Sequence, residues 1–427
     1  MTIWIFVVMV CLFGIGLPVC WSMAVAAAAY MLLVPQVSLI MVVQRMVEGL
    51  DNFPLLAVPF FILAGNLMNN GGITDRLVIF ARFLVGHITG GLAHTVVVAN
   101  MVMAGMSGSG TADAAGTGAV LVPAMRKAGY GVPFSAAIVG AAATIGPIIP
   151  PSIPFVIYGS MANVSVGRLF LAGALPGVVM GVILMAFAYV IARHRDYPRE
   201  RRASWREIKT ATIRALPPLG MPAIIMGGII GGIMTPTEAA VAGAVYAFVL
   251  GVFVYREIKA AQLPTIFFES ALTSGAIAII VAAAAPIGWI LTFEQAAQNA
   301  VALIAAAHLT TWQLYLVINV VLLILGCLMD GMAILIMTIP ILMPVVQHAG
   351  IDPVQFGIVL SINIMIGTIT PPVGMIMYVV CGIGKISIWE FSREIWPFVI
   401  ALTLALVIVT YIPGIAMWLP NLVMPAR

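Results

Sequence analysis

The segments TIGPIIPPSIPFVIYG, which starts at Thr144, and MIGTITPPVGMIMYVV, which starts at Met365, are two versions of one pattern in this chain of 427 residues. Each segment breaks an apolar run with a Gly followed by two adjacent prolines, and the two copies are 221 residues apart. The same spacing holds on both sides of the motif, so the chain contains a tandem repeat. Matching pairs include Gly105 with Gly326, Gly110 with Gly331, Pro123 with Pro344, Gly146 with Gly367 and Pro176 with Pro397.

The composition places this repeated unit in a membrane. Hydrophobic residues are 63% of the chain and charged residues are 8%, whereas about a quarter of the residues of a soluble domain are charged. A membrane-spanning helix needs about 20 consecutive apolar residues. Several windows are at least that long, namely 3–34, 169–192, 216–254 and 398–419. We therefore expect an all-α polytopic membrane protein.

Residues 193–214 carry eight basic and three acidic side chains, a net charge of +5 in a chain whose net charge is +4. A basic patch can bind nucleic acid, but this one is short and lies between two long apolar runs. The positive-inside rule explains it better, because Lys and Arg are retained on the cytoplasmic side of a membrane. We expect a cytoplasmic linker here, no nucleic-acid partner, and membrane lipid around the apolar segments.

This linker separates the two repeats. If the copies have opposite orientations, both the N-terminus and the C-terminus lie outside the cytoplasm. The turn charges favour inversion, because Arg126 and Lys127 of one repeat correspond to Gln347 and His348 of the other. The expected division is a first inverted repeat at 1–192, with scaffold and arm at 1–86 and a hairpin and broken-helix core at 87–165; the basic linker at 193–214; and a second inverted repeat at 215–427, with scaffold and arm at 215–310 and core at 311–385.

Each repeat has a Gly-rich apolar segment before its Pro-Pro break. The segments AGMSGSGTADAAGTGAVLVPAM (104–125) and LGCLMDGMAILIMTIPILMP (325–344) have small or polar residues at their centres. Each arm is about 12 to 16 residues, short of a full span, which favours re-entrant helical hairpins. Adjacent prolines beside a Gly free several backbone carbonyls at one depth. A bilayer tolerates such groups only where they face a partner, water or an ion.

The hairpin tips and the breaks together predict two binding sites for a cation and a place for an anionic substrate. Oxygens on opposed helix ends suit a hard monovalent cation, and helix N-termini suit an anion. Gly and Ser can equally permit close helix packing, and that alternative stays open for each single residue. The candidates for the cation are Ser107, Ser109, Thr144, Gly146, Gly326, Asp330, Gly367 and Thr370, and those for the substrate are Ser107, Gly108, Ser109, Thr111, Asp113, Pro150, Asp330 and Pro371.

Three carboxylates occur in apolar surroundings, where ionisable groups point to function. Asp113 and Asp330 lie at or just after the hairpin centres. Each could line the transport path or cap the N-terminus of a half-helix. Glu238, in TPTEAA (235–240), is expected to cap a helix. No Lys or Arg occurs at 83–125 or 128–167, so a carboxylate substrate there would be held by backbone N–H groups and hydroxyls.

Catalysis is not indicated by this sequence. The five histidines are scattered without an HExxH spacing, and the four cysteines show no CxxC pairing. We therefore expect that the chain is not an enzyme and that its cysteines are small buried hydrophobic residues. The histidines are His87, His94, His194, His308 and His348.

Six segments spread along the chain form a recognisable set. They are FPLLAVPFFILAGNLMNNGG (53–72), SGSGTADAAGTGAVLVPAM (107–125), TIGPIIPPSIPFVIYG (144–159), GGIMTPTEAA (231–240), LMDGMAILIMTIPILMPV (328–345) and GIDPVQFGIV followed by IGTITPPVG (350–374). Together they resemble the large membrane subunit of the tripartite ATP-independent periplasmic (TRAP) transporters, and the resemblance covers essentially the whole chain. One departure is Gly110, where the family often has a second Ser.

The resemblance implies a sodium-coupled secondary importer of an organic acid, such as a C4-dicarboxylate or sialic acid, that works by an elevator mechanism in the bacterial inner membrane. It implies two or more Na⁺ ions at the cation sites above. It also implies two partners, a small four-helix membrane subunit and a periplasmic substrate-binding protein. By the same resemblance, residues 38–53 and 255–268 would be arm helices that lie along the membrane interface. Without the resemblance, the alternative is that they are amphipathic loops at the membrane surface. The alternative is a stand-alone ion-coupled carboxylate transporter or antiporter of related architecture.

Overall fold

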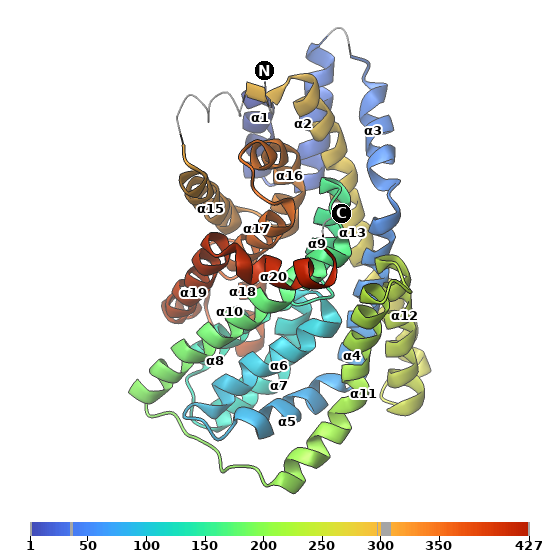
Figure 1. Ribbon diagram of the computed structural model, residues 1–427. Coiled ribbons are helices and arrows are strands. Elements are labelled where there is room, and N and C mark those ends of the chain that lie inside the picture. Colours follow the sequence, from blue (N-terminus) through green and yellow to red (C-terminus); the bar gives the residue numbers. More distant parts are fainter. Residues whose placement is uncertain (1, 35–36, 297, 300–308, 426–427) are drawn as a thin grey trace.

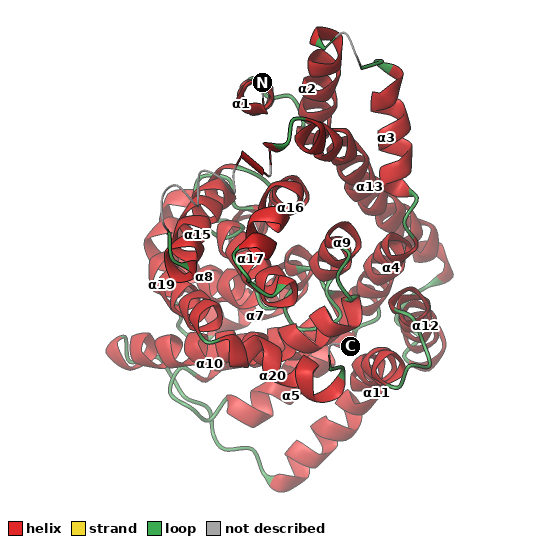
Figure 2. Cartoon of the chain, turned by 45° about the horizontal axis from the view of Figure 1, so that its top comes forward, coloured by secondary structure: helices red, strands yellow, loops and turns green. Residues whose placement is uncertain are grey.

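The structure is a computed structural model that describes residues 2–34, 37–296, 298–299 and 309–425. In that part of the chain every regular element is a helix (Figures 1 and 2). Eight of the described helices are long and apolar enough to cross a membrane. The prediction of an all-α polytopic membrane protein is therefore confirmed. His308 and residues 300–308 of the predicted second scaffold segment lie outside the described residues.

The first repeat runs from α1 to α10. Its helices are α1 Thr2–Gly14, α2 Val19–Leu33, α3 Ile40–Leu50, the short 3₁₀ helix η1 Phe53–Leu56, α4 Ala57–Asn70, α5 Ile73–Val85, α6 Gly91–Ser107, α7 Gly110–Lys127, α8 Val132–Ala143, α9 Ile153–Ala162 and α10 Val166–His194. Helices α6 and α7 form hairpin 1, and α8 and α9 are the two halves of the first broken helix.

The second repeat runs from α11 to α20. Its helices are α11 Trp205–Ile230, α12 Pro236–Val249, the π-helical turn η2 Leu250–Val254, the 3₁₀ helix η3 Ala260–Gln262, α13 Leu263–Phe293, α15 Thr311–Leu328, α16 Gly331–His348, α17 Pro353–Gly367, α18 Met375–Gly384, α19 Ile388–Tyr411 and α20 Pro413–Val423. Helices α15 and α16 form hairpin 2, and α17 and α18 are the halves of the second broken helix.

The spacing of 221 residues holds for whole helices as well as for single residues. Helices α7 and α16 match at both ends at this offset, α6 and α15 match at their last residues, and α8 and α17 match at their first. Both Pro-Pro pairs lie between helix halves, and both of their peptide bonds are cis. The sequence repeat is therefore a repeat of secondary structure.

The hairpin arms are longer than the sequence indicated. They have 17 or 18 residues each, instead of about 12 to 16, which makes them about 26 Å long at 1.5 Å per residue. The sequence estimate was too short because α7 continues past Pro123 as far as the basic pair Arg126 and Lys127. The hairpin geometry itself is present, because the two arms of each pair pack together and both tips line one cavity.

The two cores interlock across the repeats. Helix α9 of the first repeat packs against α16 and α17 of the second, and α18 of the second repeat packs against α7 and α8 of the first. The second half of each broken helix, α9 or α18, therefore packs against the core helices of the other repeat. This arrangement brings the two hairpin tips together in the interior of the molecule.

One of the two predicted arm helices has the expected form. Helix α3 is a separate amphipathic helix that packs along α13, as Figures 1 and 2 show. Residues 255–268 do not form a second arm of this kind. From Leu263 onward they belong to α13, a continuous helix of 31 residues. The amphipathic stretch was wrongly taken as a separate arm, because Pro264 stands in the first turn of α13, where a proline does not interrupt a helix.

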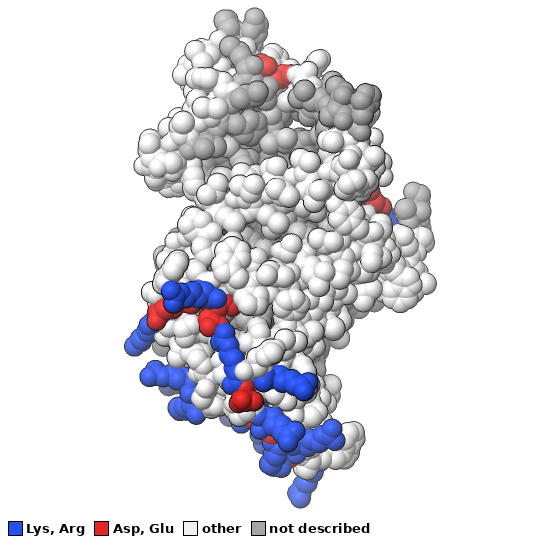
Figure 3. Space-filling model, turned by 90° about the vertical axis from the view of Figure 1, so that its left-hand side faces the viewer, with Lys and Arg blue, Asp and Glu red and all other residues white. Residues whose placement is uncertain are grey.

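The basic linker is shorter than the predicted 193–214. Helix α10 ends at His194, and α11 begins at Trp205 after a capping box between Ser204 and Glu207. The intervening residues 195–204 are fixed to the surface, because Glu200 forms an ion pair of 2.7 Å with Arg82 of α5, and Arg195 one of 2.9 Å with Glu394 of α19. Lys and Arg side chains gather on the lower part of the face in Figure 3.

A second capping box begins α12. The Thr235 side chain accepts a hydrogen bond from the Glu238 backbone, and the Glu238 carboxylate accepts one from the Thr235 N–H at 2.7 Å. The prediction that Glu238 caps a helix is confirmed.

Candidate functional site

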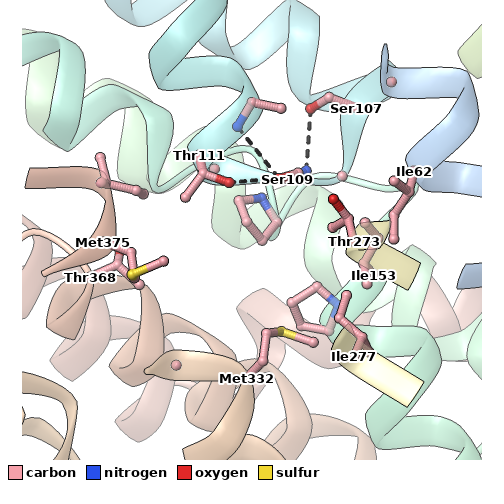
Figure 4. A pocket seen from close by; sticks show the side chains of 18 of the residues that line it. Ile62, Ser107, Ser109, Thr111, Ile153, Thr273, Ile277, Met332, Thr368 and Met375 are labelled. Carbon is pink, nitrogen blue, oxygen red and sulfur yellow. Dashed lines mark hydrogen bonds between the residues drawn. The ribbon is translucent and has the colours of Figure 1, made fainter. Parts of the chain in front are cut away.

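A cavity of about 540 Å³ lies where the two hairpin tips meet. Its wall is completed by the second halves of both broken helices, by α4 and by α13 (Figure 4). The cavity therefore receives residues from both repeats. Among the predicted site residues, those that line it are Ser107, Gly108, Ser109, Thr111 and Asp330.

The tip of hairpin 1 lies directly against the first break. Gly108 has a φ of +60°, a conformation that favours glycine, and a Cβ added there would lie 2.7 Å from the Pro151 carbonyl oxygen. Ser109 is the N-cap of α7, and its Oγ lies 3.2 Å from the Thr111 Oγ1 (Figure 4). The turn thus presents two hydroxyls and the first turn of α7 to the cavity.

Asp113 lies behind this tip and does not line the cavity. Its side chain is completely buried, and its Oδ1 accepts a hydrogen bond of 2.5 Å from the Ser107 hydroxyl. Its Oδ2 has no hydrogen-bond partner, and a Cβ added at Gly146 would touch that oxygen. The carboxylate is therefore enclosed between the hairpin tip and the first break. The expectation that it lines the transport path does not fit this position.

The tip of hairpin 2 is built differently. Asp330 is the N-cap of α16, and its Oδ2 accepts hydrogen bonds from the Met332 N–H at 2.9 Å and the Ala333 N–H at 3.2 Å. The Asp330 carboxylate therefore caps the N-terminus of α16, and it also lines the cavity. A Cβ added at Gly331 would lie 3.4 Å from the Thr368 Cγ2, so this tip faces the second break.

Gly326 and Gly367 allow their two helices to touch. A Cβ added at Gly367 would lie 2.5 Å from the Gly326 Cα and 2.7 Å from its carbonyl oxygen. At Gly326 and Gly367, therefore, the glycines do permit close helix packing, which was the alternative left open by the sequence. The same contact leaves the Gly326 carbonyl beside the break.

The remaining predicted residues are buried or lie outside the cavity lining. The Thr144 hydroxyl donates to the Ala141 carbonyl at 2.6 Å, and the Thr370 hydroxyl donates to the Ile366 carbonyl at 2.7 Å. Each hydroxyl oxygen keeps lone pairs that could accept from or bind another group. Neither Pro150 nor Pro371 is part of the described cavity lining, so the structure does not bring these two to the cavity.

Sequence reasoning missed several polar residues around the cavity. Asn66 of α4 lines it and donates to the Ser270 hydroxyl at 2.8 Å, and Thr273 of α13 lines the same wall. Near the second break, the Asn363 side chain donates to Asn319 at 2.7 Å, and its own Oδ1 has no hydrogen-bond partner. The signal that could have found Asn66 and Asn363 is a single amide inside an otherwise apolar run.

Four helix N-termini contribute to the electrostatics of the cavity. The first turns of α7, α9, α16 and α18 all contribute residues to its lining. In the described lining Asp330 is the one charged side chain. First-turn amides have no partner within their own helix, and the helix end carries partial positive charge. The cavity can therefore attract an anion without Lys or Arg.

Comparison with known proteins gives the family. The model of the "Tripartite ATP-independent periplasmic transporter, DctM component" matches residues 5–415. The chain belongs to this family. It is 40% identical over 407 residues to the sialic acid TRAP transporter large permease protein SiaM of Vibrio cholerae, covering 95% of both chains. It is 40% identical over 377 residues to the C4-dicarboxylate TRAP transporter large permease protein DctM of Pseudomonas aeruginosa, covering 88% of both.

Membership of this TRAP family settles the broad role. The chain is a large permease of a tripartite transporter, a class that works with a small membrane subunit and a periplasmic binding protein, and it is a multi-pass bacterial membrane protein. It is not an enzyme, as predicted. The fold is similar to that of the YdaH transporter of Alcanivorax borkumensis, with a TM-score of 0.64, 14% sequence identity, and coverage of 86% of this chain and 87% of that one.

Proposed function

We propose that this TRAP permease is a sodium-coupled importer of an organic acid that a periplasmic binding protein delivers. The observation that carries the proposal is the cavity of about 540 Å³, which both hairpin tips line and which four helix N-termini face. Relatives named for sialic acid and C4-dicarboxylates support a carboxylate as the substrate. The enclosed space is large enough for an organic acid of that size class.

The carboxylate of the substrate binds at hairpin 1 and the adjoining start of α9. At hairpin 2 the Asp330 carboxylate already accepts from two first-turn amides and adds negative charge to the cavity. At hairpin 1 the N-cap is the neutral Ser109, and the Thr111 hydroxyl is exposed to the cavity. An anion is therefore favoured near α7 once a sodium ion compensates the buried Asp113 carboxylate behind this tip. Apolar parts of the substrate face Met332, Ile277 and Met375 on the other walls (Figure 4).

The first sodium ion binds between the hairpin 1 tip and the first break. The buried Asp113 Oδ2 lacks a hydrogen-bond partner and lies beside Gly146. An unpaired oxygen of a buried carboxylate is costly unless a cation or a proton meets it. Sodium is a hard cation that prefers such oxygens. Ser107 Oγ and the hydroxyl oxygens of Ser109 and Thr144 are further side-chain oxygens of this region.

The second sodium ion binds at the corresponding place beside hairpin 2, mainly through backbone oxygens. The Gly326 carbonyl lies against Gly367, and Thr370 contributes a hydroxyl oxygen in the break. The Asn363 Oδ1 is buried without a partner one helical turn before Gly367. Asp330 can contribute its Oδ1, because the cap uses its Oδ2.

Sodium and substrate then cross the inner membrane by an elevator motion of the interlocked core against the scaffold and arms. Support for a rigid moving unit comes from the cross-repeat packing of α9 and α18, which ties the two hairpins together. With the basic linker in the cytoplasm, inverted repeats place both termini in the periplasm.

The test is uptake into liposomes that contain the chain and its small membrane subunit. We expect uptake of a sialic acid or C4-dicarboxylate panel only when a cognate binding protein and an inward sodium gradient are both present. A potassium gradient of the same size is the matched control, because it supplies the same ionic strength without sodium.

Two results would contradict the proposal in different ways. Uptake driven by protons without sodium would reject the sodium sites and leave the tripartite assembly intact. Uptake of free substrate by the chain alone would favour the alternative, a stand-alone ion-coupled carboxylate transporter or antiporter.

A further inference from the structure

A second cavity lies far from the hairpin tips, at the basic linker. It has a volume of about 410 Å³ and lies between α5 and the first three turns of α11. One wall is apolar and consists of Ile79 and Phe83 of α5. The opposite wall includes Arg206, Thr210 and Arg214, which are four residues apart and therefore lie on one face of α11. We call this cavity the linker groove.

The two arginines of this face are free to bind an anion. Glu207 is the one acidic residue in the described lining of the groove, and it pairs with Arg201 and accepts from the Ser204 N–H at 2.7 Å. In the part of the chain that the structure describes, neither Arg206 nor Arg214 has a carboxylate within 4 Å. The groove thus carries uncompensated positive charge.

The position of the groove matches the headgroup layer of a membrane. Helix α11 is a candidate span that begins at Trp205, whose side chain is 80% exposed. Exposed Trp residues gather at the membrane surface. Within α11 the exposed face changes from basic to apolar at Ile213 and Leu216, which are 60% and 63% exposed. The guanidinium groups therefore lie at the boundary between water and hydrocarbon.

We propose that the linker groove binds one anionic phospholipid, with its phosphodiester between Arg206 and Arg214 and its glycerol and upper acyl chain against Ile79 and Phe83. Guanidinium groups bind phosphate oxygens through paired N–H donors, and basic pockets on the cytoplasmic side of membrane helices suit lipid headgroups. The Thr210 hydroxyl lies between the two arginines on the same face. Free phosphate would satisfy the arginines but would leave the apolar wall in contact with water.

The experiment titrates the purified full chain with phosphatidylglycerol or phosphatidylcholine and counts retained lipids by native mass spectrometry. The test variant is Arg206→Gln with Arg214→Gln. The matched control is Arg202→Gln with Lys209→Gln, which removes the same charge from the same segment at exposed residues outside the groove lining. Because each Arg near an anionic surface contributes about fivefold in affinity, we expect phosphatidylglycerol binding to fall by roughly twentyfold in the test variant and by less than about threefold in the control.

Three outcomes would overturn the proposal. Equal losses in both variants would show that the charge of the whole linker attracts lipid without a specific site. Displacement of phosphatidylglycerol by an excess of inorganic phosphate would show a free-anion site. Loss of the bound lipid when the small membrane subunit is added would show that a protein occupies the groove. Unchanged retention of phosphatidylcholine in all variants is the expected background and supports the specificity for the anionic headgroup.

Discussion

Hairpin 1 and hairpin 2 share the same register at their tips and differ by one residue in the first arm, but they place their carboxylates at different positions. In hairpin 1 the N-cap of the second arm is Ser109 and the carboxylate, Asp113, is one turn further on. At the offset of 221 residues, Ser109 corresponds to Asp330, the N-cap of hairpin 2, and Asp113 corresponds to Ile334, which is completely buried. One hairpin therefore buries a charge where the other buries an apolar side chain.

In the proposed function, this difference gives two ways of building a cation site from the same fold. Beside hairpin 1 a side-chain carboxylate with an unpaired oxygen faces the break. Beside hairpin 2 the Gly326 and Gly367 backbones are in contact, so the available oxygens are backbone carbonyls, the Asn363 amide, the Thr370 hydroxyl and the Asp330 Oδ1. The first site should depend on one residue, and the second should depend on how closely two helices approach.

The comparison presupposes that the two hairpins enter from opposite sides of the membrane. Single cysteines that replace Lys127 and His348, both exposed at the ends of corresponding arms, test this in a background without the four native cysteines. We expect an impermeant maleimide to label one position from outside and the other only after the membrane is opened. Labelling of both from the same side would remove the inverted repeat and the elevator reading with it.

The largest functional difference should appear at Asp113. Replacement with Asn keeps the shape and removes the charge. A hydrogen bond or ion contact to a charged group contributes about 1.5–3 kcal/mol, so the sodium concentration for half-maximal uptake should rise by at least about tenfold. The measurement is uptake against sodium concentration in liposomes. Ser107→Ala should raise that concentration less, because the carboxylate remains. An unchanged sodium dependence in Asp113→Asn would remove the carboxylate from the first site.

Alanine substitutions at Gly146 and Gly367, which correspond to each other in the two repeats, should distinguish the two proposed cation sites. In Gly146→Ala the new methyl group would touch the Asp113 Oδ2, so we expect weaker sodium dependence with a folded protein. In Gly367→Ala it would meet the Gly326 backbone, so we expect a loss of about 1–3 kcal/mol in the free energy of unfolding. Gly382→Ala is the matched control, because nothing lies within 4 Å of its added Cβ. Equal effects on stability at Gly146 and Gly367 would contradict the distinction.

The smallest effect is expected at Asp330. Because Asn caps a helix about as well as Asp, Asp330→Asn should change the unfolding temperature little and shift the sodium dependence by less than about threefold. Thermal unfolding and sodium titration of uptake measure the two quantities. A loss as large as that in Asp113→Asn would show that the Asp330 charge itself binds the ion, and the two hairpins would then be functionally equivalent.

The sequence predicted the repeat, the breaks and the tips because Gly and Pro act locally on the backbone. The breaks start at Thr144 and Thr368, as the Gly-Pro motifs indicated. The sequence could not predict whether a given side chain faces the cavity or the packed interior. Asp113 and Asp330 looked alike in sequence, and only the packing of α7 against α8 encloses one of them.

The repeat motifs also could not predict that α4 and α13 form a wall of the cavity. Asn66 and Thr273 are far apart along the chain, and neither belongs to a Gly-Pro motif. Their approach depends on long-range helix packing, which no local spacing encodes. The prediction of a second arm helix failed for a related reason, because residues 263–268 begin α13, which continues without interruption into the cavity wall.

The interlocking of the broken helices also has a consequence for how the chain folds. Helix α9 has only 10 residues, too few to be stable alone, and the helices α16 and α17 that bury it are synthesised about 170 residues later. Helix α9 also packs against α4 and α10 of its own repeat, but its contacts with the second repeat can form only after that repeat has been made. We therefore expect that a fragment ending at the linker would lack the residues of α16 and α18 that complete the cavity wall.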